Sequence, residues 1–158
     1  MRKLILSLPI LFAFIMVLSG CGKTAADPTP TELLTKTWSV NIAKHDGTQV
    51  YQKSATTNID AGYTNYKLSL SGTGASLTAS LTARDNTTFT GAWSLSSDGK
   101  TLTLSGLKNS AGVAPTGTPG TIIYNIIGTI TATNVTLESA AKDLKAGNST
   151  VNLQLVNP

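Results

Sequence analysis

The stretch that decides the fold is residues 88–104, which read TFTGAWSLSSDGKTLTL. Apolar residues take alternate positions on both sides of the Asp98-Gly99 pair, and Ser or Thr takes most positions between them. Strict alternation directs the apolar side chains to one face of a strand. An Asp-Gly pair tolerates the positive φ angles of a tight hairpin. The stretch therefore predicts two antiparallel strands with one dry face and one wet face.

The same alternation recurs along the chain, in residues 38–42, 66–70, 77–82 and 151–155. Two further turn signals, Asp46-Gly47 and Asp85-Asn86, separate neighbouring segments. The sequence thus predicts an all-β, antiparallel up-and-down meander of about eight or nine strands that closes as a barrel. A two-sheet β-sandwich is the alternative, because the long connection at 108–120 allows a crossover between sheets. An outer-membrane barrel is disfavoured, since its strands need roughly 9–11 residues and the alternating segments of this chain are shorter.

Three segments depart from the simple alternation. Residues 121–131 are apolar on both faces, which predicts a long strand with a covered outer face and a bend at Gly128. Residues 31–36 predict one helical turn capped by Thr31. Residues 138–146 predict a short helix before the last strand, with a Glu138–Lys142 pair and Gly147 as its stop. This helix is a candidate cover for the sheet.

The N-terminus has the layout of an export signal. A positive Arg2-Lys3 pair precedes an apolar run over 4–17, and small residues follow it before Cys21. The order Leu18-Ser19-Gly20-Cys21 resembles the bacterial lipobox, which implies cleavage between Gly20 and Cys21 and a lipid on the Cys21 thiol. The alternative is an uncleaved membrane anchor, but the run is at the short limit for a span. We expect a signal peptide at 1–20, a flexible tether at 21–32 and one β domain at 33–158.

Charge and cysteine content restrict the function classes. The formal charge of +4 becomes +2 once Arg2 and Lys3 are removed, and the ten remaining cations are scattered singly. Nucleic-acid binding therefore has no support. Cys21 is the single cysteine, so the β domain has no disulfide and no thiolate metal site.

A family resemblance follows from two segments. The first, ELLTKTW at residues 32–38, opens the first strand after the tether, and the second is the hairpin from Trp93 to Leu104. Together with the lipobox they resemble the lipocalin-like lipoproteins of Gram-negative bacteria. The resemblance implies an antiparallel barrel, attachment to the outer membrane on its periplasmic or outer side, and a cavity for a small apolar molecule. Lys36 replaces a glycine of the better-known lipocalin pattern, and no arginine near the last strand is placed to pack over Trp38.

Catalytic chemistry finds little support in the sequence. His45 is the single histidine and sits beside a predicted turn, where solvent exposure is usual. The carboxylates fall mainly in the tether, the turns and the predicted helix, where aspartates shape the backbone. We therefore expect no enzyme, no metal site and no cofactor.

Four aromatic residues share the inward phase of their strands and are the candidate ligand-binding residues: Tyr66, Phe89, Trp93 and Tyr124. Core packing alone also accounts for them. Trp38, at the start of the first strand, is expected to plug one barrel end. The leading hypothesis is a lipid-anchored binding module for a small apolar or amphipathic molecule. The alternative is a solid-core surface protein, such as an accessory subunit of an envelope complex, with the segment at 121–131 covered by a protein partner.

Overall fold

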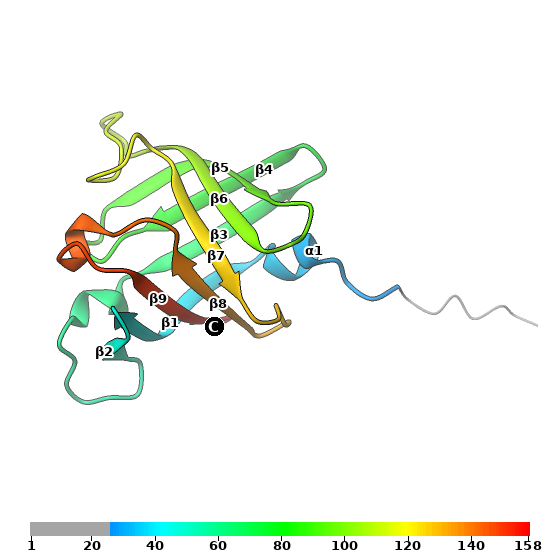
Figure 1. The fold of residues 1–158 in the computed structure, drawn as a ribbon. Helices are drawn as coiled ribbons and strands as arrows, with labels where there is room; N and C mark the ends of the chain where they lie inside the picture. The colour runs from blue at the N-terminus through cyan, green and yellow to red at the C-terminus, as the bar shows by residue number, and fades with distance from the viewer. Residues whose placement is uncertain (1–25) are drawn as a thin grey trace, which may run out of the picture.

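The structure is a computed structural model that describes residues 26–158, so the predicted signal peptide and Cys21 lie outside the described residues. Those residues form nine strands and three short helical segments, coloured in sequence order in Figure 1. The helical segments are the helix α1 (Pro30–Leu34) and the 3-10 turns η1 (Ala61–Thr64) and η2 (Leu144–Ala146). The strands are β1 (Thr37–His45), β2 (Thr48–Gln52), β3 (Lys67–Thr73), β4 (Ser76–Thr82), β5 (Thr88–Leu95), β6 (Thr101–Lys108), β7 (Ile122–Ile127), β8 (Asn134–Ser139) and β9 (Val151–Val156).

One antiparallel sheet closes on itself through β1. The first residues of β1 pair with β3, the longer part pairs with β9, and its end also pairs with β2. From β3 to β9 each strand pairs with the next one along the chain. The result is a closed barrel of eight strands with β2 as an extra strand, which confirms the predicted up-and-down meander that closes as a barrel. The β-sandwich alternative is wrong, because the connection at 109–121 returns the chain to the neighbouring strand β7.

The three predicted turns, at 46–47, 85–86 and 98–99, are present between neighbouring strands. Asp46 and Gly47 both have positive φ, at 45° and 85°, and connect β1 directly to β2. Asn86 has φ 62° between β4 and β5, and Gly99 has φ 70° between β5 and β6. These values fit residues that tolerate left-handed backbone, so local chemistry sets the hairpin register.

The helix α1 and Trp38 close one end of the barrel. Pro30 begins the helix, and Thr29 and Glu32 form a reciprocal capping box, so the cap is Thr29 and not the predicted Thr31. Leu34 and Trp38 are fully buried, and the Trp38 indole Nε1 donates to the Leu34 carbonyl oxygen at 3.0 Å. The expected plug is therefore present, and it is made by the helix and the tryptophan together.

The predicted helix over 138–146 is wrong. Glu138 and Ser139 end β8, whose residues pair with β9, and only Leu144–Ala146 are helical. Val135 and Leu137 are buried at alternate positions, so pairing with β9 and burial outweigh the local helix propensity of this stretch.

The cover predicted for β7 is absent among the described residues, since Ile123 and Ile127 on its outer face stay 42% and 46% exposed. The strand is also shorter than the predicted 121–131. It ends before Gly128, whose φ of 76° takes the chain into the next turn.

The two barrel ends differ. Figure 1 shows α1 at one end, and the connections β6–β7 and β8–β9 at the other. All strands, α1 and the closing β1–β9 pairing lie within 26–158, so the chain from residue 22 onward keeps the whole folded unit. No helix in the described part is both long and apolar enough to span a bilayer.

Candidate ligand-binding pocket

A pocket of about 430 Å³ occupies the barrel end opposite α1. Its mouth is formed by residues from the β4–β5 turn, the β6–β7 loop and the β8–β9 connection. Toward the barrel interior the pocket is lined by Tyr66, Leu81, Phe89, Tyr124, Ser139 and Leu153, which are apolar or aromatic apart from Ser139. The next residues toward α1, such as Leu68 and Ala79, are buried in the core and do not line the pocket. The barrel is thus packed solid in one half and hollow in the other.

Two tyrosines face each other across the deep part of the pocket. Tyr66 stands immediately before β3 and Tyr124 lies on β7, four strands away in a ring of eight. Their hydroxyl oxygens are 3.1 Å apart, and each side chain is 6% exposed. Burial raises the pKa of Tyr124 to about 12 and raises the pKa of Tyr66 as well. Both phenols therefore stay protonated at neutral pH.

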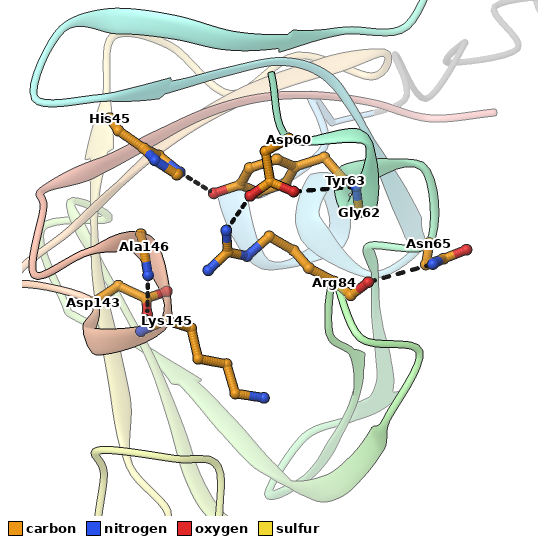
Figure 2. A network of polar contacts seen from close by, with 9 residues as sticks. All are labelled: His45, Asp60, Gly62, Tyr63, Asn65, Arg84, Asp143, Lys145 and Ala146. Atoms are coloured by element: carbon orange, nitrogen blue, oxygen red, sulfur yellow. Dashed lines mark hydrogen bonds and ion pairs between the residues drawn. The ribbon is translucent and has the colours of Figure 1, made fainter. Parts of the chain in front are cut away.

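A polar network supports the pocket wall beside η1, and Figure 2 shows its residues. The Arg84 guanidinium forms an ion pair with Asp60 and stands 5.1 Å from the ring centre of Tyr63, which it faces. Asp60 also accepts a hydrogen bond from the Gly62 backbone N–H at 3.1 Å, as the cap of η1. Each polar group of the network thus holds its neighbour in place, and the network fixes Arg84 and Tyr63 at the pocket.

His45 is partly buried and joins this network. Its Nε2 lies 2.8 Å from the Tyr63 hydroxyl, and burial, with a smaller effect from Arg84, lowers the pKa of His45. The ring is therefore neutral at pH 7, and its contacts orient the Tyr63 side chain. The expected solvent exposure of this histidine is only partial, because the β2–β3 connection, including η1, packs Tyr63 against β1.

The other side of the mouth carries a second ion pair. Lys145, on η2, binds Asp85 in the β4–β5 turn, and this hydrogen bond is the main cause that lowers the pKa of Asp85 to about 2. Asp143 accepts hydrogen bonds from the backbone of Lys145 and Ala146 and so shapes η2. The pair links two of the chain segments that border the opening.

Three of the four predicted ligand-binding residues lie together in the pocket: Tyr66, Phe89 and Tyr124. Trp93 does not line it. Its ring is buried nearer α1, and its Nε1 donates to the Ser71 carbonyl oxygen at 3.0 Å. Binding of a ligand by the three pocket residues stays a prediction.

Tyr63 and Arg84 line the same pocket and were not predicted from the sequence. They belong to an irregular segment and a turn, where no periodicity marks an inward position. The nearest sequence signal to Arg84 was the Asp85-Asn86 pair, which predicts a turn but not a pocket residue. Within residues 26–158 no group of three or more His, Cys, Asp or Glu side chains is placed to hold a metal ion.

Comparison with known proteins gives a structural likeness and no sequence relative. No protein-family model matches the chain, and the search of curated proteins found no match. Among solved structures, the chain is similar to a lipocalin-like protein from Bacteroides uniformis ATCC 8492. The two are 16% identical with a TM-score of 0.47, and the match covers 80% of this chain and 99% of that one.

Proposed function

We propose that this protein is a non-enzymatic binding protein that holds one small apolar or amphipathic molecule in the open half of its barrel. The observation that supports the proposal is the pocket of about 430 Å³, within the roughly 300–1,000 Å³ usual for small-molecule sites. Its deep lining is mostly apolar and aromatic, and its few polar groups are held in fixed positions. Such a lining favours the burial of an apolar ligand, because apolar surface is removed from water.

The test of binding is native mass spectrometry of the chain from residue 22, purified without detergent. We expect an additional mass that disappears on denaturation. Ala83→Trp fills the pocket from its wall, so this variant is expected to lose the extra mass. Ala92→Trp is the matched control, because Ala92 is exposed on the outer face of β5. A bare mass for the parent chain, even after incubation with apolar extracts, contradicts the proposal.

We further propose that Cys21 carries a lipid that attaches the domain to the outer membrane of a Gram-negative cell. The support is the sequence at 18–21 and the polar tether after it. Two or more acyl chains would hold the protein stably, whereas one gives only marginal binding. Cys21→Ser is expected to move the protein from the membrane fraction to the soluble fraction without acylation. Retention of an acylated Cys21→Ser protein in the membrane would contradict the anchor.

The exposed outer face of β7 favours a second candidate function, that of a surface interaction protein. Ile123 and Ile127 stand partly exposed on the outer face of β7, with the exposed Asn125 between them. A protein partner, such as another subunit of an envelope complex, would bury them. In a mild-detergent extract, Ile127→Lys should then dissociate the protein from its complex. Thr90→Lys, on the outer face of β5, should leave the complex intact. A monomer in the parent extract would remove this candidate.

A further inference from the structure

The Tyr66–Tyr124 pair has one more proton than its own hydrogen bond uses. Each phenol carries one O–H donor, and the contact between the two oxygens uses one of them. Each oxygen therefore has a partner, and no buried polar side-chain atom of residues 26–158 is without one. The second proton, however, has no acceptor among the described residues, because neither hydroxyl makes another hydrogen bond there. A buried donor without an acceptor is unfavourable.

Ionisation does not remove this donor. Burial raises the pKa of both tyrosines, so neither becomes a phenolate at neutral pH. Because the accepting hydroxyl is polarised by its neighbour, it is a better donor than an isolated phenol. The deep pocket thus presents one directed donor inside an otherwise largely apolar lining.

A water molecule satisfies this donor poorly. A stable buried water needs two to four polar partners, and the side chains of Leu81, Phe89 and Leu153 provide none. Ser139, opposite Tyr124, has one hydroxyl, which already accepts a hydrogen bond from the Val151 N–H. A carbonyl oxygen needs only a donor and tolerates apolar surroundings on its other sides. The lining therefore fits an apolar molecule with a single acceptor oxygen better than it fits solvent.

A negatively charged acceptor is disfavoured at this position. The burial that keeps the two phenols protonated also penalises a carboxylate. Three cations line the pocket, and two of them, Arg84 and Lys145, are already paired with Asp60 and Asp85. The third, Lys142, is exposed in the β8–β9 connection at the mouth, so it does not compensate an anion at the deep Tyr66–Tyr124 position.

We propose that the ligand of this pocket is an apolar molecule with a neutral carbonyl oxygen that accepts the free proton of the Tyr66–Tyr124 pair. The inference rests on the proposed binding function and specifies its ligand class. The pair lies deep in the pocket, so the carbonyl group enters first and the rest of the molecule fills the space toward the mouth.

The experiment uses three probes of similar shape: acetophenone, isopropylbenzene and benzoate. Their dissociation constants for the chain from residue 22 are measured by ligand-observed NMR. The decisive quantity is the ratio of the constants for acetophenone and isopropylbenzene, compared between the parent and Tyr66→Phe/Tyr124→Phe. We expect the double variant to shift this ratio about tenfold against the ketone. Benzoate should bind the parent most weakly. Tyr51→Phe is the control, since Tyr51 is buried but does not line the pocket.

The outcomes separate the two proposals. If both neutral probes bind and the double variant leaves their ratio unchanged, the carbonyl inference is overturned and the binding function stands. If none of the three binds, both are overturned. A second measurement needs no variant: the infrared carbonyl stretch of bound acetophenone should lie below its frequency in a hydrocarbon solvent. A stretch equal to that in hydrocarbon would also overturn the inference.

Discussion

The indole nitrogen of Trp38 donates a hydrogen bond to the backbone carbonyl of Leu34, across the join between α1 and β1. Both residues are fully buried, so this bond ties the helix to the barrel in a place that water does not reach. The last carbonyl groups of a helix lack intrahelical donors, and the Leu34 carbonyl accepts from both the Trp38 indole and the Lys36 backbone N–H. The barrel end is thus closed by a specific bond as well as by packing.

Removal of this donor should destabilise the protein. Trp38→Phe keeps an aromatic ring but removes the indole donor, so the Leu34 carbonyl keeps only the Lys36 N–H, and the expected loss is about 0.5–1.5 kcal/mol in the free energy of unfolding. Trp38→Ala adds a cavity and should cost about 3–5 kcal/mol. Urea unfolding measures both. Ile59→Ala, at a highly exposed position, should change stability by less than about 0.5 kcal/mol. Equal stability of Trp38→Phe and the parent would disprove the structural role of the bond.

Alkaline pH should reveal the buried tyrosines. An unfolded tyrosine ionises near pH 10, whereas the pKa of Tyr124 in the folded protein is about 12 and that of Tyr66 is also raised. Below pH 10 both states keep their protons, so stability is unaffected. Above it the unfolded chain releases protons that the folded chain retains, and stability should fall by about 1.4 kcal/mol per pH unit for each tyrosine. Urea unfolding from neutral pH to about pH 11 measures this slope. Tyr66→Phe/Tyr124→Phe should reduce it and leave the contribution of Tyr63, whose pKa burial also raises; an identical slope in this variant would refute the assignment.

The Asp60–Arg84 pair should show strong coupling. The two side chains are 24% and 15% exposed, so a single change leaves a largely buried group without its partner. Asp60→Asn is expected to cost about 1–3 kcal/mol, and adding Arg84→Met should cost less than the sum of the single changes. A double-mutant cycle in urea measures the coupling. The same cycle on Asp85 and Lys145, which are more exposed, should give about 0–1 kcal/mol. Equal couplings in the two cycles would contradict this difference.

Gly91 is required by the close approach of β5 and β6. A Cβ atom at this position would lie 2.4 Å from the Ser105 carbonyl oxygen, at the place where the pairing register shifts. Gly91→Ala must therefore move one strand, and we expect a loss of about 1–3 kcal/mol, seen as a lower melting temperature. Ala92→Ser, at an exposed position on the same strand, is the control. An unchanged melting temperature for Gly91→Ala would mean that the bulge relaxes freely.

Much of the barrel was predictable because local signals and tertiary packing agree. Phe89 and Trp93 are buried as their alternation requires, and the turn at Asn86 has the positive φ that its sequence favours. The stretch at 138–146 shows where this agreement ends. Its alanines favour a helix, but Val135 and Leu137 commit the preceding residues to β8. Single-sequence propensity does not contain that pairing.

The pocket was predictable only in part. The inward phase of Tyr66, Phe89 and Tyr124 could be inferred from alternation, but their depth in the barrel could not. Trp93 shares that inward phase and lies in the solid half instead. The network of Tyr63 and Arg84 depends on a connection that folds back over the barrel end, and no periodic pattern marks it.

The plugged end and the open end have different neighbours in a tethered molecule. The described chain begins beside α1, so a lipid on Cys21 would hold the domain by its plugged end. The pocket mouth then points away from the site of attachment. An apolar ligand would therefore enter at the end of the domain farthest from the attachment. In such an arrangement the tethered domain would take up its ligand at the end opposite to its lipid attachment.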